Sequence, residues 1–428
     1  MGVWRDVARR FAFIEYDGPP LEPLELYTKK SGDEIVGQLY NFVDKGGREV
    51  ALRPEMTPTL ARMAAAKANA LRKPIRWFSM PQLFRYERQQ RGRLREHFQL
   101  NVDIIGETDV TADAELLAVA IEVMRGCGLT SNDVRARVSD RRLLRALLAT
   151  IGVGDDRADA VFGVVDKFER QPQDVSREKL AALGLSVGDV DTLFSLLGDV
   201  TLDEIERRFG QSDDVRSVIA ELRRYFAYLN GLGVLDWVTI DLKIVRGLAY
   251  YTGIVFELFD VKAELRAICG GGRYDNLLHS LGGVDLPALG FGMGDVVLSD
   301  LVRERGLFPT TGIGPQVWLA ANPDDPTSEY DVRELATKLR RAGVSVEYAL
   351  KQQSLNSQEA TAKKLRAGFF VALPQKTLGG AGDWDTLEAQ VKAYSHEGSA
   401  STAASSPMAA VPVANLVTFI VSELGQPG

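Results

Sequence analysis

The sequence predicts a mixed α+β protein built from several parts, and three observations support this. Residues 94–104 alternate between apolar and polar side chains, which is the period of a half-buried β-strand. Residues 138–228 instead repeat apolar side chains at the i, i+3, i+4 spacing of amphipathic helices. After the loop "GLFPTTGIGP" (306–315), strand and helix patterns alternate again. We therefore expect strands and helices, a helical insertion, and a separate C-terminal α/β unit.

The composition is that of an ordinary globular protein, with 428 residues of which 45% are hydrophobic and 25% charged. A net charge of -7 argues against broad nucleic-acid binding but leaves room for a local basic site for one structured RNA. Cys127 and Cys269 cannot form a disulfide framework, so we expect a reduced, cytoplasmic setting. No apolar stretch predicts a membrane span or a signal peptide, so we expect no membrane partner.

The first part of the chain mixes helix and strand patterns. It starts directly in an amphipathic pattern (Val3, Val7, Phe11), which is consistent with a short upstream piece being absent from this sequence. The segment 47–71 then predicts a strand, a turn marked by proline and an alanine-rich helix. Thr57 is the expected N-cap of that helix and Pro58 its first residue.

Residues 75–88 and 94–104 predict an antiparallel hairpin with one polar face. The stretch "FRYERQQRGRLREHFQ" (84–99) holds five arginines and no lysine. Forked guanidinium groups suit planar anions such as carboxylates and phosphates. The odd positions of the second strand carry directional hydrogen-bonding side chains: Arg93, Arg95, His97, Gln99, Asn101 and Asp103. From the pattern alone, a binding surface and an amphipathic hairpin with one face in water both remain open.

A second polar cluster follows the helical region. Arg246 lies near Tyr250 and Tyr251 in the sequence, and Tyr274 follows the run Gly270–Gly272. The glycine run taken alone favours a β-bulge, since it is neither GxGxxG nor GxxxxGK[ST]. The three histidines lack metal-ligand spacing, so we expect no metal held by protein ligands, and a Ser-His-Asp site has no local signature.

Taken together, these segments resemble the histidyl-tRNA synthetases, a family of class II aminoacyl-tRNA synthetases. "LRPEMTPTLARM" (52–63) is similar to the family's LRPE-x-T segment, and "FRYERQQRGRLREHFQLNVDIIG" (84–106) to its motif 2. "RGLAYYTGIVFE" (246–257) and "GGGRYDNLL" (270–278) resemble the two histidine-specific signatures, and "ALGFGMGDVVL" (288–298) lies where motif 3 is expected. The resemblance spans the whole chain.

The resemblance implies an architecture and a reaction. The catalytic domain would be an antiparallel sheet with flanking helices, formed by residues 1–137 and 233–310. It would be interrupted by a helical insertion, 138–232, and followed by an α/β anticodon-binding domain, 315–428. A homodimer would activate L-histidine with ATP and Mg²⁺ and transfer it to tRNA-His.

The resemblance also assigns roles to single residues. Glu55 and Thr57 would hold the α-amino group of histidine, and Gln99 and Asp103 would contact the amino acid. Three tyrosines would surround the imidazole: Tyr250, Tyr251 and Tyr274.

For ATP, Arg85 and Arg246 would act catalytically at the α-phosphate. Glu87 would contact the adenine region and Arg93 the outer phosphates, while His97 stands where an aromatic ring often stacks on adenine.

Two departures from the family pattern leave alternatives open. The arginine that usually ends motif 3 and binds the γ-phosphate is absent, since this region reads Asp295, Val296 and Val297. Ala249 replaces the aspartate of the common RGLDYY. A paralog without activation activity, such as an ATP phosphoribosyltransferase regulatory subunit, would fit these changes, although that subunit lacks an anticodon-binding domain. A general RNA-binding module would leave the Glu55, Gln99 and Asp103 set unexplained.

Overall fold

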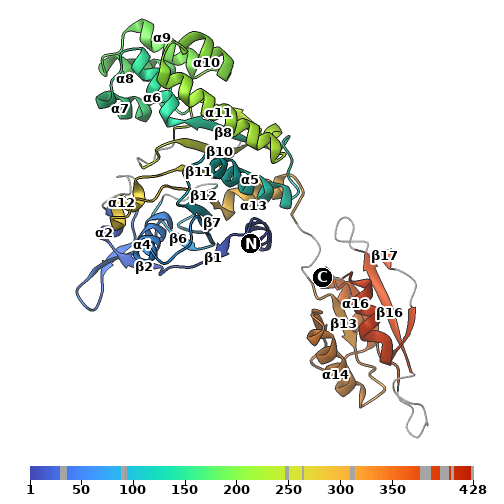
Figure 1. The fold of residues 1–428 in the computed structure, drawn as a ribbon. Helices are drawn as coiled ribbons and strands as arrows, with labels where there is room; N and C mark the ends of the chain where they lie inside the picture. The colour runs from blue at the N-terminus through green and yellow to red at the C-terminus, as the bar shows by residue number, and fades with distance from the viewer. Residues whose placement is uncertain are drawn as a thin grey trace. The chain divides into compact units, whose positions relative to one another are not determined.

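The computed structural model describes residues 1–28, 36–87, 92, 94–245, 250–262, 265–308, 314–375, 387–395, 404–405 and 409–425. The chain divides into two compact units, Met1–Phe308 and Pro309–Gly428 (Figure 1). The four-part division expected from the sequence stays a prediction, because the first unit contains the catalytic segments and the helical segment together.

A mixed sheet forms the centre of the first unit. Neighbouring strands pair antiparallel except at the two edges, where β1 with β5 and β8 with β9 are parallel. The spatial order is β1 (Ile14–Glu15), β5 (Ile75–Ser79), β7 (Glu96–Ile105), β12 (Ala288–Gly294), β11 (Cys269–Arg273), β10 (Ile254–Asp260), β8 (Val134–Asp140) and β9 (Val238–Ile240), with β6 (Gln82–Phe84) also paired to β7. The predicted α+β fold with an antiparallel-rich sheet is confirmed.

The predicted hairpin is present, with its first strand divided into β5 and β6. Trp77 pairs with Asp103 and Leu83 with His97, both in antiparallel register. The linking residues 88–91 and Arg93 lie outside the described residues. Asn101 and Asp103 are only 4% and 3% exposed, so the inner half of this face is not in water, whereas Arg95 is exposed and His97 and Gln99 are partly exposed. The end of that face near Asp103 is covered by the helices at residues 57–67 and 277–282.

One face of the sheet carries the main hydrophobic core. Leu100, Phe256 and Phe291 point to this face and are buried, as strand alternation requires. The covering helices are α1 (Gly2–Arg10), α5 (Thr111–Gly126) and α13 (Asp295–Glu304), with α11 (Asp213–Gly231) packed on α5. Burying this apolar face leaves the opposite face free to carry polar groups.

The opposite face is partly covered by α4 (Thr57–Lys67) and α12 (Leu277–Gly282), which pack on each other. A side chain at Gly282 would meet Ala65 Cβ at 2.2 Å, so the two helices approach closely there. The predicted N-cap is wrong by one residue. The helix begins at Thr57, its N-cap is the fully buried Met56, and no side chain caps it. Pro58 is the second helical residue instead of the predicted first, and it still lies in the first turn, where proline is tolerated.

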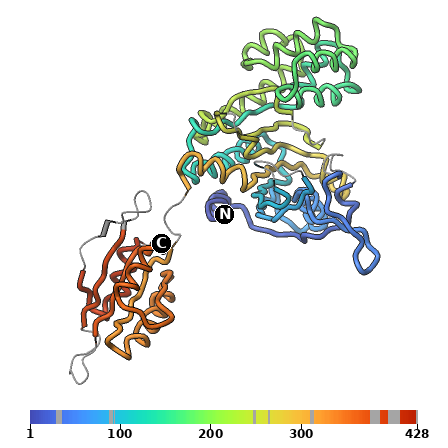
Figure 2. Tube along the Cα trace, turned by 180° about the vertical axis from the view of Figure 1, so that it is seen from behind, coloured from blue at the N-terminus to red at the C-terminus, as the bar shows by residue number. Residues whose placement is uncertain are grey.

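The expected helices of the middle segment are present and gather at one end of the unit, coloured green in Figures 1 and 2. Serine and threonine caps begin several of them, and Ser186 with Asp189 forms a full capping box. Besides α11, they are α6 (Arg141–Thr150), α7 (Asp155–Val165), α8 (Gln173–Ala182), α9 (Val187–Leu196) and α10 (Leu202–Phe209), and the 3-10 helix η1 (Leu235–Trp237) follows.

A small three-stranded sheet completes the first unit. The strand predicted at Val50 and Leu52 is β4 (Glu49–Leu52), which pairs with β2 (Leu21–Pro23) and β3 (Asn41–Val43). The short helix α2 (Glu25–Thr28) follows β2. Phe42 and Val43 on β3 are 51% and 63% exposed.

The second unit is the expected α/β fold. Strand β13 (Val317–Ala320) is parallel to β14 (Val346–Tyr348) and β15 (Phe369–Ala372), connected through α14 (Ser328–Arg341) and α15 (Leu355–Lys364). The sequence did not predict the antiparallel strands β16 (Glu388–Ser395) and β18 (Ala409–Pro412) or the short β17 (Ala404–Ser405). The last elements are η3 (Val413–Asn415) and α16 (Leu416–Glu423).

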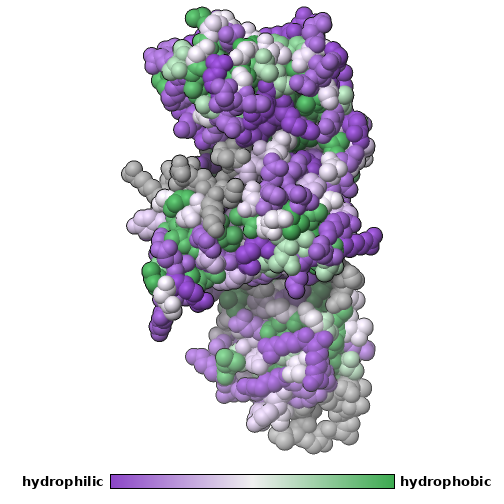
Figure 3. Space-filling view, turned by 60° about the vertical axis from the view of Figure 1, so that its left-hand side comes forward, coloured by the Kyte–Doolittle hydropathy of each residue, from purple (hydrophilic) through white to green (hydrophobic). Residues whose placement is uncertain are grey.

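Polar and charged residues cover much of the face shown in Figure 3, with apolar side chains between them. Across the described segments, none of the helices is both long and apolar enough to cross a membrane.

Candidate active site

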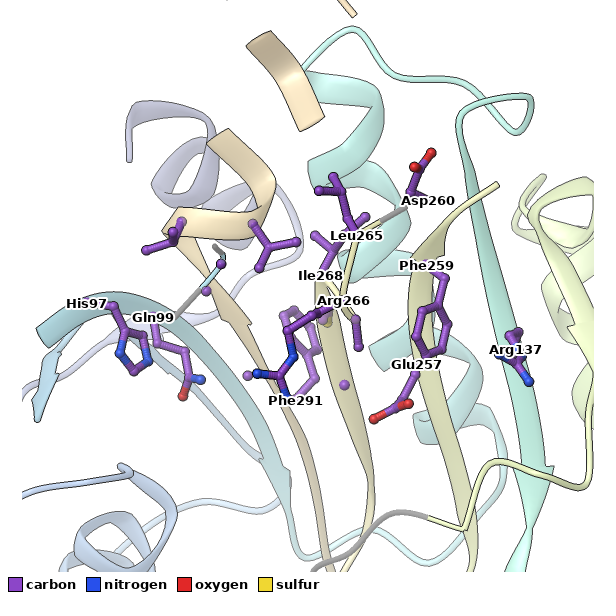
Figure 4. A pocket seen from close by; sticks show the side chains of 18 of the residues that line it. His97, Gln99, Arg137, Glu257, Phe259, Asp260, Leu265, Arg266, Ile268 and Phe291 are labelled. Atoms are coloured by element: carbon purple, nitrogen blue, oxygen red, sulfur yellow. The ribbon is translucent and has the colours of Figure 1, made fainter. Parts of the chain in front are cut away.

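A cavity of about 850 Å³ opens on the face of the central sheet opposite the main core. Strands β7, β12, β11, β10 and β8 pass beneath it, and Figure 4 shows side chains rising from them. Both polar clusters singled out in the sequence contribute to its lining. The sheet therefore brings together residues that are about 240 positions apart, from Glu55 to Gly294.

Glycines form the floor of this cavity. Gly290 is paired with Asp103 and Gly292 with Asn101 on the neighbouring strand. A Cβ at Gly290 would lie 2.0 Å from Asp103 Oδ1, and one at Gly292 would lie 2.8 Å from the Gln99 amide. Because neither position has room for a side chain, the floor is open for the polar side chains of β7 and for a ligand.

The glycine run 270–272 is part of a regular strand, so the predicted bulge is wrong. Strand β11 pairs continuously with β10 on one side and β12 on the other, with no residue skipped. A Cβ on Gly272 would lie 2.7 Å from the Ile254 carbonyl oxygen and 3.0 Å from the Tyr251 ring. Close approach of the neighbouring strand explains the glycine there.

One end of the cavity, here called the recognition end, is built around Asp103 and Tyr274. The Tyr274 hydroxyl donates a hydrogen bond to Asp103 Oδ1 at 2.5 Å, and the two residues are only 2% and 3% exposed. Burial raises the pKa of Asp103 to about 7, although the hydrogen bond from Tyr274 opposes this. Burial and the neighbouring Asp103 also raise the pKa of Tyr274. The pair can both donate and accept hydrogen bonds near neutral pH.

The other residues assigned to the amino acid belong to the same cavity. Glu55, Thr57 and Gln99 line the cavity, and Glu55 is only 5% exposed. Tyr250 and Tyr251 also line it, with ring centroids 5.0 Å apart, and the Tyr250 ring is 5.8 Å from that of Tyr274. Asp103 does not itself line the cavity, but it is hydrogen-bonded to Tyr274, which does. The three tyrosines form a continuous aromatic wall beside a buried carboxyl group.

The opposite end, here called the nucleotide end, contains Arg85, Glu87 and His97. Arg85 Nε donates to the Pro54 carbonyl oxygen at 2.9 Å, and Arg85 Nη1 lies 3.9 Å from Glu87 Oε1. Burial, with the nearby Arg85 charge, lowers the pKa of His97 to about 4. His97 is therefore a neutral ring beside a cation at physiological pH.

Two residues assigned to ATP, Arg93 and Arg246, lie outside the described residues, and so does Ala249. Gly92, at the tip of the hairpin, does line the cavity.

Several charged lining residues were missed in the sequence. Arg137 of β8 donates to Asp241 at 2.7 Å and forms ion pairs with Glu169, which also contacts Lys243 at 3.0 Å. Glu257 of β10 is paired with Arg137 across the sheet. Alternation in "VRARVSD" (134–140) would have placed Arg135 and Arg137 on one face. Arg266 comes from a loop, where no periodic pattern exists to find it.

No group of three or more His, Cys, Asp or Glu side chains arranged to hold a metal ion is found within the part of the chain that the structure describes.

Comparison with known proteins identifies the family. The family model described as Histidyl-tRNA synthetase matches residues 5–295. The chain belongs to this histidyl-tRNA synthetase family. A histidine–tRNA ligase of Opitutus terrae is 44% identical over 361 residues, which cover 83% of this chain and 82% of the relative. The histidine–tRNA ligase of Haloarcula marismortui is 39% identical over 411 residues, covering 91% and 94%.

Solved structures show the same fold. The histidyl-tRNA synthetase of Nostoc sp. PCC 7120 superposes with a TM-score of 0.81 at 22% identity, covering 99% of this chain and 94% of that one. A Bacillus halodurans protein described as an ATP phosphoribosyltransferase regulatory subunit/histidyl-tRNA synthetase gives 0.71 at 24% identity, covering 88% and 93%. The fold is thus shared by synthetases and by a protein described with both names, so it does not separate the two functions.

Proposed function

We propose that the cavity of this histidyl-tRNA synthetase family member activates L-histidine with ATP and transfers it to tRNA-His, which makes the chain a histidine–tRNA ligase. The observation that carries the proposal is the buried Asp103–Tyr274 pair beside an aromatic wall, at one end of a cavity whose other end holds Arg85. The curated relatives named histidine–tRNA ligase cover most of the chain, which favours this function over a regulatory paralog.

The recognition end suits an imidazole. Its ring has two nitrogens, of which one donates and one accepts a hydrogen bond in the neutral form. Asp103 would accept from the ring N–H, while Tyr250, Tyr251 and Tyr274 would pack around it. Glu55, Thr57 and Gln99 would hold the α-amino group and backbone of the amino acid. An amino acid without these ring nitrogens would leave the polar groups buried and unpaired, so it would be rejected strongly.

In the first step, a histidine carboxylate oxygen attacks the α-phosphorus of ATP. A new P–O bond forms while the bond to the bridging oxygen of pyrophosphate breaks, giving histidyl-adenylate and pyrophosphate. Two anions must approach each other, so a guanidinium fixed beside them lowers the barrier by positioning and by preorganised charge. Arg85, oriented by the Pro54 carbonyl, would act there. From the sequence, Arg246 would act at the same phosphate and Arg93 at the outer phosphates.

Glu87 and His97 would hold the adenine end of the nucleotide. His97 offers a flat, uncharged ring for stacking, because its lowered pKa keeps it neutral. A neutral ring avoids placing a second cation against Arg85.

Mg²⁺ would accompany ATP, and the residues present fit it. With nucleotides this ion uses one or two carboxylates together with phosphate oxygens and waters, so a cluster of three protein ligands is not required. Glu257 lines the cavity and would supply such a carboxylate. When bound, the ion would neutralise part of the phosphate charge.

In the second step, a terminal ribose hydroxyl of the tRNA attacks the adenylate carbonyl and AMP leaves. We infer that the separate C-terminal unit is the anticodon-binding domain, since it folds around its own core. Exposed Phe42 and Val43 support association with a second copy. Free Cys127 and Cys269 are consistent with a cytoplasmic protein.

The test is ATP–pyrophosphate exchange by the purified protein with each standard amino acid in turn. We expect histidine alone to support exchange. Comparable exchange with another amino acid would overturn the pocket assignment. No exchange with any amino acid would favour the regulatory paralog instead.

A further inference from the structure

Arg266 lies in the connection between β10 and β11 and lines the cavity. Its side chain is exposed, and in Figure 4 it extends into the cavity between Gln99 on β7 and Glu257 on β10. The Arg266 guanidinium group therefore extends into the cavity, although Arg266 belongs to neither polar cluster of the sequence.

The stem of Arg266 lies beside the first turn of α13. A Cβ built on Gly92 would lie 3.4 Å from Val297 Cγ2 and 4.0 Å from Arg266 Cδ. Gly92, the start of α13 and Arg266 therefore lie close together. Val296 and Val297 line the cavity there, and their side chains carry no polar group.

The charge of Arg266 is available to a ligand, in contrast to that of neighbouring cations. Arg137 and Lys243 are each paired with both Glu169 and Asp241. Arg266 forms no ion pair with any other residue in the described ranges. An exposed guanidinium fork is suited to phosphate oxygens, which it can bind in bidentate geometry.

We propose that Arg266 binds the outer phosphates of ATP and supplies, from the neighbouring loop, the cation that the start of α13 lacks. This inference rests on the proposed function, since it assumes that ATP occupies the cavity. Arg266 is then a substrate-binding residue for the first step, and its loss should affect ATP while sparing histidine.

The first experiment compares the full-length wild type, Arg266→Ala and Lys262→Ala in histidine-dependent exchange at varied ATP and histidine. Lys262 is an exposed cation of the same loop that does not line the cavity, so it is a matched control. Loss of a charged hydrogen bond predicts that the KM for ATP rises about tenfold or more in Arg266→Ala. The KM for histidine should stay within about twofold, as both constants should in Lys262→Ala.

Inhibition by AMP distinguishes phosphate binding from adenine stacking. AMP lacks the outer phosphates, so its inhibition constant should be the same for wild type and Arg266→Ala. An equal rise for AMP and ATP would overturn the assignment to the outer phosphates. A rise in the histidine KM as large as that for ATP would show a structural role and would also overturn it, as would behaviour identical to Lys262→Ala.

A relocation variant tests the geometry. Arg266→Ala combined with Val297→Arg should recover at least about fivefold of the lost ATP affinity, because the charge returns to the same phosphates. If the buried position 297 prevents folding, judged by circular dichroism, Val296→Arg replaces it. Recovery in neither would contradict the shared site. Absence of exchange in the wild type would instead contradict the proposed function itself. Failure of the proposed function can therefore be distinguished from failure of the Arg266 inference.

Discussion

The two ends of the cavity lie on one face of the sheet but differ in burial and in charge. At the recognition end, Asp103 and Tyr274 are almost fully buried and burial raises the pKa of both. At the nucleotide end, His97 loses its charge through burial and a neighbouring cation, while Arg85 is half-buried and held by a carbonyl oxygen. The first end offers paired hydrogen-bonding groups, and the second offers a fixed positive charge.

This difference indicates that the recognition end selects the amino acid and that the nucleotide end promotes the reaction at the phosphoryl group. Buried groups that need a hydrogen-bonding partner discriminate strongly between similar ligands. A guanidinium at a phosphoryl group acts mainly on the transition state, where charge develops. Changes at the recognition end should therefore alter the KM for histidine, and changes at the nucleotide end should alter kcat or the KM for ATP.

The largest effect is expected for Arg85→Ala. Loss of one preorganised charge at a reacting phosphoryl group typically lowers the rate about a hundredfold to a thousandfold. We expect the kcat of pyrophosphate exchange to fall by this factor, with the KM for histidine changed much less. Steady-state exchange at saturating ATP measures both constants. A rise in the histidine KM that accounts for the whole loss would break the division between the two ends.

Gly290→Ala should damage the recognition end without removing a polar side chain. The new methyl would overlap Asp103 Oδ1, displacing the carboxyl from Tyr274. Loss of this buried contact predicts a fall of roughly a hundredfold in kcat/KM for histidine.

Gly294→Ala is the matched control on the same strand. Its nearest neighbour for a new Cβ is His97 Cδ2 at 4.0 Å, so it has room. Exchange kinetics of the two variants give the comparison, and equal losses would show that the glycine floor is not specific to Asp103.

Asp103→Asn should lower kcat/KM for histidine about tenfold to a hundredfold, because the amide replaces a charged acceptor. Its pH dependence is more specific. With the pKa of Asp103 at about 7, the carboxylate acceptor is lost as pH falls below that value. Wild-type kcat/KM should therefore decline from pH 8 to pH 6, with an ionisation that is absent from the variant.

Asp103 should also affect how the stability of the protein depends on pH. Because its pKa is raised in the folded protein, the protonated form stabilises the fold. That contribution is complete below about pH 4 and is lost as pH rises through about 7. Urea unfolding midpoints from pH 4 to pH 8 should fall more steeply in wild type than in Asp103→Asn. Parallel curves would indicate that Asp103 does not titrate in this range.

Much of the recognition end could be predicted from local patterns. Strand alternation placed Gln99 and Asp103 on one face of β7, and the structure confirms that they share it. Pairing of β7 with β5 and β6 also followed from the hairpin pattern. These predictions succeeded because backbone geometry alone decides which alternate side chains point the same way.

The remaining parts depended on contacts between distant segments. Gly290 looks like any strand glycine until Asp103 is known to lie opposite it. Gly272 is a similar case: the glycine run alone favours a bulge, whereas in the structure Gly272 pairs regularly with Val255. Strand β16 was missed because its sequence "EAQVKAYS" is weakly apolar and is buried by distant segments, among them β15 and β18. Tertiary context overrides local propensity in such cases.

The smallest effect is expected for His97→Phe. The pKa of His97 at about 4 means that the ring is already neutral from pH 5 to pH 8, so a neutral aromatic ring should replace it well. We expect the KM for ATP to stay within about threefold, whereas His97→Ala should raise it by about fivefold or more through lost stacking. The wild-type KM for ATP should show no ionisation near pH 6.5, where an unperturbed histidine titrates. An ionisation there that disappears in His97→Phe would mean that the imidazolium forms beside Arg85, and the nucleotide end would then rely on two charges instead of one.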